Sequence, residues 1–380
     1  RNNQAAPESS AKSSQAKKEE PKAEPLSEAA KEKIAKRAKS TAEEYVSIVD
    51  INEADACLAE LMKEFKNHVD VPHMFAKEIL LSAIEAKNNV RDGMFAMLEK
   101  LVLEKKSLPY ASIRFGIAKM IEAGVDLWCD VPKLHEHVAD IVARFMKESA
   151  ITGVSFDWLV CGCGKTLDAE IFEEVVQGGF LAAAAGQALK LLKQSSLEKA
   201  KNEVRTTYSM LQSLFAPHGR DAKSIQKWIA KFDIADVLPL EPAFGLVELA
   251  NKTESYEEVV SWIEGNIPIA LRTDSVFATH TCLFILDHYK KGELPSPERC
   301  MLLTGFCGDV ETQARLVSGI FQTRTDSDEI KQLLKHLKKE GAVMSTAFSK
   351  WLELKNDTSA SRKQAVEQYS SFVDELARSK

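Results

Sequence analysis

The sequence predicts an all-α protein made of HEAT-like antiparallel helical hairpins, arranged in two consecutive domains. Apolar residues recur at the three- and four-residue spacing of helices along almost the whole chain from Glu28 onward. Helix pairs follow one another about every thirty to forty residues, and no stretch alternates apolar and polar residues as a half-buried strand does. Since one such pair cannot bury its apolar face alone, we expect the pairs to stack on one another.

The composition is that of a folded protein without a membrane-spanning segment. The chain has 380 residues, 45% hydrophobic and 28% charged, which is enough for two or three domains with their own cores. No apolar run reaches the roughly 18 residues of a membrane span, and no secretory signal opens the chain. Seven cysteines, an odd number, favour the reduced thiols of a cytoplasmic protein. Because the first residue is Arg1 rather than methionine, we expect a fragment or a processed piece.

Charge is distributed unevenly along the chain. The net charge is −6, but residues 1–40 hold ten Lys and Arg against six Asp and Glu, a balance of +4, so the remainder carries −10. A body with that excess is poorly suited to hold the phosphates of nucleic acid directly, because such binding depends on Lys and Arg. It suits a basic protein partner better.

The first segment, residues 1–28, is predicted to be a disordered linker. It consists mainly of Ser, Ala, Lys, Glu and Pro and has almost nothing to bury. Its lysines could touch RNA weakly, although a solvated linker is the simpler interpretation.

Four helices are predicted next, and each has apolar residues on one face. The third begins at Asp70-Val71-Pro72, a favourable start because the carboxylate accepts backbone N–H groups and proline needs no donor in a first turn. The predicted ranges are 28–50, 52–65, 70–84 and 90–104.

A helical hairpin is then predicted over residues 114–146. The first helix should end at Gly124, which suits a left-handed C-terminal position. Asp130 precedes Val131 and Pro132 and is predicted to cap the second helix. The turn between the helices displays two carboxylates, Asp126 and Asp130. By spacing alone these could be a solvated loop residue and a cap, without any binding role.

This hairpin resembles the MI domain, also called MA3, of the translation initiation factor 4 gamma scaffold and of the programmed-cell-death-4 repressor. The resemblance is carried by residues 126–132 (DLWCDVP), 42–45 (AEEY) and 52–55 (NEAD), and weaker motifs extend it to about residue 215. It implies a helical MI domain over residues 29–238. It also implies that Asp126 and Asp130 bind the DEAD-box RNA helicase initiation factor 4A.

The rest of the chain is also predicted to be helical. Trp158 and Trp228 are expected to be core residues, and Pro239, Pro242 and Gly245 mark a short connection between the two domains. Apolar faces are predicted at 171–176, 181–192 and 204–215, and helices at 256–265, 275–289, 298–306, 310–321, 328–339, 343–354 and 361–377.

The last two helices resemble the W-two domain that closes initiation factor 4 gamma, initiation factor 5 and the epsilon subunit of the exchange factor. The resemblance is carried by two aromatic and acidic boxes, which comprise Phe348, Trp351 and Glu353, then Tyr369, Phe372, Asp374 and Glu375. It implies a W-two domain over residues 240–380 whose boxes dock a MAP-kinase-interacting kinase or another basic partner. The usual acidic tail is replaced by Ala-Arg-Ser-Lys, and the rings could instead close the core of the last helices.

No catalytic, metal or cofactor site is predicted. Residues 161–166 (CGCGKT) lack the leading glycine of a phosphate-binding loop and the second cysteine pair of a zinc site, so buried thiols are expected. His135 and His137, two positions apart on a helix, point to different faces and are expected at the surface.

Three functional hypotheses remain open. The first is a cytoplasmic, non-enzymatic adaptor of translation initiation that reaches mRNA only indirectly, through the initiation complex. The second is a repressor that sequesters the helicase, although such repressors carry two MI domains. The third is a helical scaffold for unrelated partners.

Overall fold

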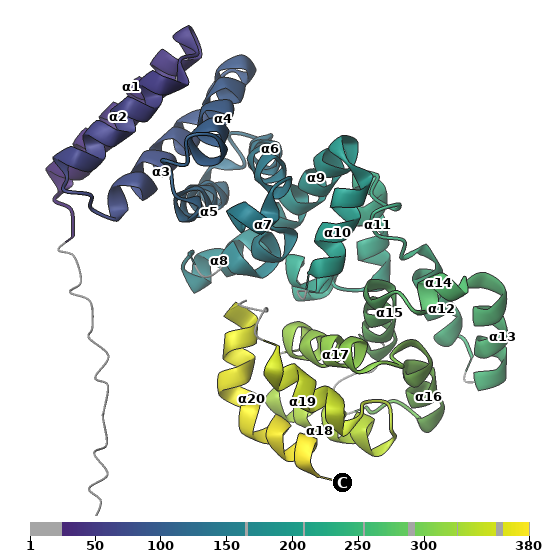
Figure 1. Ribbon diagram of the computed structural model, residues 1–380. Coiled ribbons are helices and arrows are strands. Elements are labelled where there is room, and N and C mark those ends of the chain that lie inside the picture. The colour runs from purple at the N-terminus through teal and green to yellow at the C-terminus, as the bar shows by residue number, and fades with distance from the viewer. Residues whose placement is uncertain are drawn as a thin grey trace, which may run out of the picture.

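The computed structural model describes residues 25–163, 166–207, 210–253, 255–287, 293–324, 326–354 and 360–379. Within these ranges the chain is helical and contains no strand, which confirms the all-α prediction (Figure 1). Most of the predicted linker, residues 1–24, lies outside the described residues. The first helix begins as predicted at Glu28, where the Ser27 hydroxyl accepts a hydrogen bond from the N–H of Ala30.

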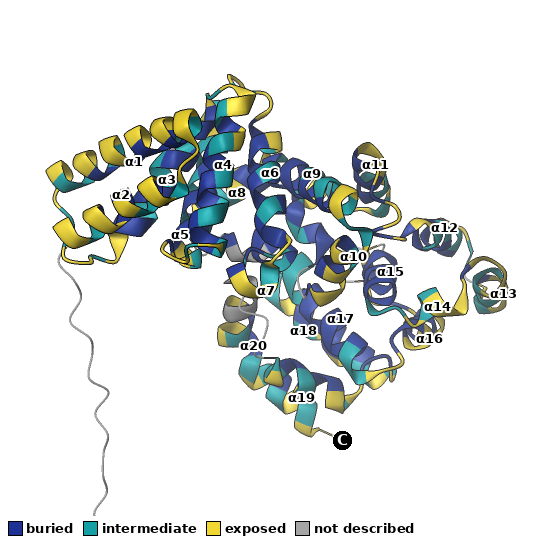
Figure 2. Ribbon diagram, turned by 45° about the horizontal axis from the view of Figure 1, so that its top comes forward, coloured by how far each residue is buried: buried dark blue, intermediate teal, exposed yellow. Residues whose placement is uncertain are grey.

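Six helices form three hairpins at the N-terminal end. Helix α3 packs between α1 and α5, while α4 contacts α2 and α6, so odd and even helices form two layers. Figure 2 shows the buried residues on the sides where these helices face one another. The bounds are α1 Glu28–Ile48, α2 Ile51–Glu64, α3 Asp70–Ile84, α4 Asn88–Leu103, α5 Tyr110–Leu127 and α6 Leu134–Met146.

The middle of the chain is less regular than predicted. The apolar face predicted over 204–215 is not one helix, because α10 ends at Thr206 and only a short 3-10 turn follows. Helix α6 packs against α9, which continues the stack. The elements are α7 Ser149–Thr152, the π-helix η1 Trp158–Gly162, α8 Ala169–Gln177, α9 Phe180–Ser195, α10 Leu197–Thr206, η3 Leu211–Leu214, η4 Pro217–Gly219 and α11 Ala222–Phe232.

The C-terminal helices match the predicted ranges within about two residues wherever the chain is described. Two further helices, α12 and α14, were not predicted, and Pro242 lies in the first turn of α12 rather than in a connection. The bounds are α12 Glu241–Ala250, α13 Tyr256–Asn266, α14 Ile269–Arg272, α15 Ser275–Asp287, α16 Pro297–Phe306, α17 Val310–Thr323, α18 Ser327–Lys339, α19 Ser345–Glu353 and α20 Ala360–Arg378.

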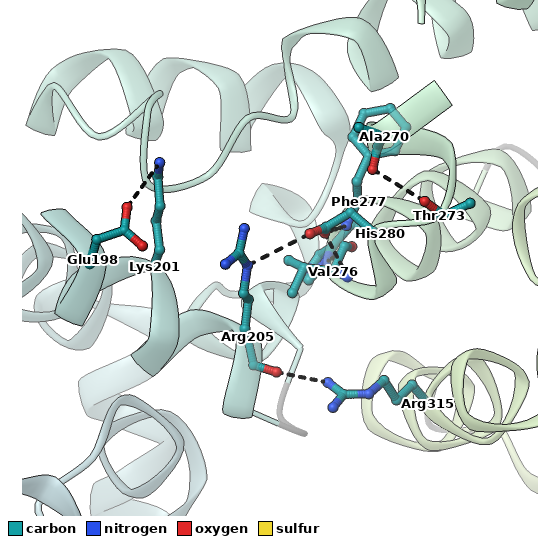
Figure 3. Close-up of polar contacts among 10 residues, drawn as sticks. Glu198, Lys201, Arg205, Ala270, Thr273, Val276, Phe277, His280 and Arg315 are labelled. Atoms are coloured by element: carbon teal, nitrogen blue, oxygen red, sulfur yellow. Dashed lines mark hydrogen bonds and ion pairs between the residues drawn. The ribbon is translucent and has the colours of Figure 1, made fainter. Parts of the chain in front are cut away.

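A continuous apolar core runs through the stack, and Trp158 and Trp228 belong to it as predicted. The end of α10 and the residue after it contact α17 through polar groups. Arg315 Nη1 donates to the carbonyl oxygens of Arg205 (3.3 Å) and Thr207 (3.1 Å), as Figure 3 shows for Arg205. Helix α20 returns to contact η1 (Figure 1). The two halves therefore pack together, and the boundary near residue 238 stays a prediction.

The structure also bears on the expectations for the cysteines, for the motif of residues 161–166 and for membrane-spanning helices. Cys57, Cys163, Cys282, Cys300 and Cys307 are buried thiols, whereas Cys129 is exposed. Lys165 of the glycine- and cysteine-rich motif lies outside the described residues. In the described part of the chain no single helix is long and apolar enough to cross a membrane; α8 and α9, bent by 70°, meet that test only as a pair, by length and composition.

Candidate functional site

The last turn of α5 and the connection to α6, together called the acidic turn, hold the two carboxylates that the sequence indicated, Asp126 and Asp130. Helix α5 runs past Gly124 to Leu127, so the prediction that Gly124 ends the helix is wrong. Gly124 is buried, and a β-carbon there would lie 2.9 Å from the ring of Phe180. This position needs glycine because an aromatic ring from α9 packs directly against the backbone of α5.

Asp130 does not cap α6, contrary to the prediction. That helix begins four residues later at Leu134, with Lys133 as its N-cap residue and no side-chain capping hydrogen bond. The indole Nε1 of Trp128 donates to the carbonyl oxygen of Pro132 at 3.2 Å. This contact ties the carbonyl of Pro132 to the indole of Trp128 within the turn. Asp130 and Pro132 both lie before the first residue of α6.

Trp128 positions this acidic turn on the helical stack. Its ring packs edge-on against Phe180, with ring centroids 5.1 Å apart, and against His135 at 5.8 Å. Burial lowers the pKa of His135, so its imidazole is neutral at neutral pH and adds no positive charge beside the carboxylates. The sequence contained Trp128 in the turn motif but gave no sign of its partner Phe180, which lies in another hairpin.

Asp126 and Asp130 are both exposed, and neither carboxylate makes an ion pair or side-chain hydrogen bond with another described residue. Asp126 lies in the last turn of α5, where a negative charge opposes the helix dipole by about 0.3–1 kcal/mol. Both carboxylates are therefore accessible to solvent at this end of the hairpin.

Near this turn, the burial of His137 differs from the prediction. The prediction of a surface histidine is wrong for His137, which is 9% exposed and whose Nδ1 makes no hydrogen bond with any residue that the structure describes. His135 is half-buried, with its Nδ1 3.1 Å from the carbonyl oxygen of Pro132. The His135 ring therefore packs against the turn, whereas the His137 ring is buried in the stack.

The aromatic residues of the two C-terminal boxes lie mainly in the core. Phe348 and Trp351 are fully buried and Tyr369 is 4% exposed. The ring of Phe321, from α17, lies 4.8 Å from both the Trp351 ring and the Tyr369 ring. In this arrangement the three buried rings close the core, which is the alternative that the sequence left open.

The other members of the boxes remain accessible. Glu353 and Glu375 are exposed, and Phe372 is half-buried, with Lys335 Nζ 5.6 Å from its ring centroid. Asp374 pairs with Arg378 at 2.7 Å, so the basic tail that replaces the usual acids neutralises one carboxylate of the box. Any docking here would use the acids and the edge of Phe372.

Comparison with known proteins connects this geometry to a family. Residues 34–152, which include the acidic turn, match the MA3 domain. The chain is 28% identical over 121 residues to eukaryotic translation initiation factor 4 gamma 3 from Homo sapiens, covering 32% of this chain and 7% of that protein. It is 24% identical over 250 residues to factor 4 gamma 1 from Oryctolagus cuniculus, covering 62% of this chain and 16% of that protein. The matched part is thus a small fraction of these relatives.

Proposed function

Because residues 34–152 form an MA3 domain similar to that of translation initiation factor 4 gamma, we propose that this chain is an adaptor of translation initiation. In this proposal Asp126 and Asp130 bind the DEAD-box RNA helicase initiation factor 4A. The observation that supports it most is the exposure of two unpaired carboxylates on a turn held by Trp128, inside the MA3 match.

The proposed mechanism is tethering rather than catalysis, in the cytoplasm. The turn holds both carboxylates on a rigid support. This chain therefore loses little conformational entropy when a basic surface of the helicase binds to it. The second half would hold a MAP-kinase-interacting kinase or another basic partner through Glu353, Phe372, Asp374 and Glu375. Linking partners on one chain raises their effective concentration near the mRNA, which the adaptor itself reaches only through the complex.

Helicase capture tests the proposal. Asp126→Asn with Asp130→Asn removes both charges and keeps the side-chain shape. We expect binding about tenfold weaker, because two exposed charge contacts contribute about 1–2 kcal/mol together. Binding should also weaken as salt rises. The matched control is Glu32→Gln with Glu43→Gln, the same change of charge at two exposed positions of α1. Equal capture by both double variants and the original chain would count against the site.

A repressor that sequesters the helicase would use the same carboxylates. The sign of the effect on helicase ATPase activity separates the two proposals, since an adaptor should stimulate it and a repressor should inhibit it. If the full chain captures no helicase at all, the helical scaffold for unrelated partners is the better description.

A further inference from the structure

A pocket elsewhere in the MA3 domain has no part in the function proposed above. It lies between one face of α1 and the beginning of α2 and has a volume of about 200 Å³. It uses the two motifs, residues 42–45 and 52–55, that the acidic turn leaves without a role. Its lining residues are Thr41, Glu44, Tyr45, Ile48, Asp50, Glu53 and Ala54.

The charge in this pocket has one sign. Glu44, Asp50 and Glu53 are exposed carboxylates, and no described Lys, Arg or His lines the pocket. One oxygen of Asp50 caps α2 by accepting from the N–H of Asn52 at 2.8 Å, which leaves its second oxygen available. A cation beside the pocket, Lys105, donates to the side chain of Asn52 at 2.6 Å instead of pairing with these carboxylates. The pocket therefore attracts a positively charged side chain and repels phosphate.

A largely buried tyrosine side chain also lines the pocket. Tyr45 is 4% exposed and lines the pocket, and its hydroxyl makes no hydrogen bond to any residue that the structure describes. The hydroxyl oxygen is not one of the fully buried atoms without a partner, so it stays accessible to a group that can bind it. The Tyr45 hydroxyl is therefore free to donate to a group that enters the pocket.

The rim of the pocket is apolar and strained. Ile48 is 65% exposed and its neighbour Val49 is 61% exposed. Val49 is also the left-handed C-cap residue of α1, with φ of 60°, a conformation that normally selects glycine or asparagine. Neither the strain of a β-branched residue nor two aliphatic side chains in water helps the domain fold, so this rim is suited to contact with a partner.

We propose that this pocket docks a basic segment of a partner protein. A Lys or Arg side chain enters between Glu44, Asp50 and Glu53, and aliphatic side chains beside it in the segment cover Ile48 and Val49. A backbone carbonyl of the segment accepts a hydrogen bond from the Tyr45 hydroxyl. The site shares no residue with the acidic turn and so adds a second protein contact to the same domain.

Methyl NMR on the full chain, labelled at Ile and Val methyl groups, tests this proposal. The probe is an acetylated, amidated hexapeptide, Ala-Leu-Lys-Arg-Leu-Ala. We expect saturable shifts of the Ile48 and Val49 methyl signals. A peptide with Glu in place of Lys and Arg should give none, and one with Ser in place of Leu should bind more weakly. Absence of shifts at Ile48 and Val49 with the first peptide at millimolar concentration would overturn the proposal.

Two variants in the pocket and two control variants locate the binding. Glu44→Gln with Glu53→Gln should weaken binding of the first peptide about tenfold, and Tyr45→Phe about two- to tenfold. The control Glu32→Gln with Glu43→Gln, which changes the same charge on α1 outside the pocket, should leave it within about twofold. The variant Asp126→Asn with Asp130→Asn should also bind the peptide normally. An equal loss in either of these last two variants would overturn the proposed site while leaving the helicase proposal untouched.

Discussion

Replacing Trp351 by alanine tests whether the first C-terminal box belongs to the core. The side chain is fully buried, and its ring lies 4.8 Å from that of Phe321, which is equally close to Tyr369. Removing such a ring costs the transfer free energy of the indole and leaves a cavity between α17, α19 and α20, together about 3–5 kcal/mol of the free energy of unfolding. A partner-binding tryptophan would be exposed, and its loss would change stability by less than about 0.5 kcal/mol.

Urea unfolding followed by far-ultraviolet circular dichroism measures this difference. With a urea m-value of about 2 kcal/mol/M, the loss lowers the midpoint of the transition that includes α19 by about 1.5–2.5 M. The control is Glu353→Ala, an exposed member of the same box on the same helix, which should move the midpoint by less than about 0.3 M. A midpoint for Trp351→Ala within about 0.3 M of the original would refute the core assignment.

Three other predictions follow from particular contacts. Gly124→Ala forces a β-carbon to within 2.9 Å of the Phe180 ring, so thermal unfolding should show a loss of about 1–3 kcal/mol; a raised Tm would contradict this packing. Val49→Asn relieves a β-branched residue at φ of 60° and should stabilise the chain by about 1 kcal/mol in urea, whereas Val49→Ile should not. Burial lowers the pKa of His280 from 6.5 to about 4, so the unfolded chain binds a proton that the folded chain does not. Stability should therefore fall by about 3 kcal/mol between pH 6.5 and pH 4, and a variant with Gln at His280 should lack this part of the slope.

The positions of most helices followed from the sequence, because apolar spacing is a local property. The range predicted for the third helix, 70–84, agrees with α3 at both ends. The same reasoning failed at the ends of other helices. It placed Gly124 at a helix end and Asp130 at a cap, whereas α5 continues past Gly124 against the Phe180 ring and α6 begins only at Leu134. Trp128, in the turn between the two helices, packs against the same distant ring. A local cap is worth about 1 kcal/mol, which one buried aromatic contact outweighs.

Helix periodicity and charge are read directly from neighbouring residues, so the amino-acid sequence was enough to predict a stack of helical hairpins with an acidic body. It also indicated the two carboxylates of the turn, which the structure leaves exposed. Which aromatic rings are exposed became clear from the packing of the folded chain. Trp351 and Tyr369 are buried where Phe321, at least thirty residues away in the chain, packs against both rings. Burial depends on which distant segments meet, and the spacing of residues within one helix does not contain that information.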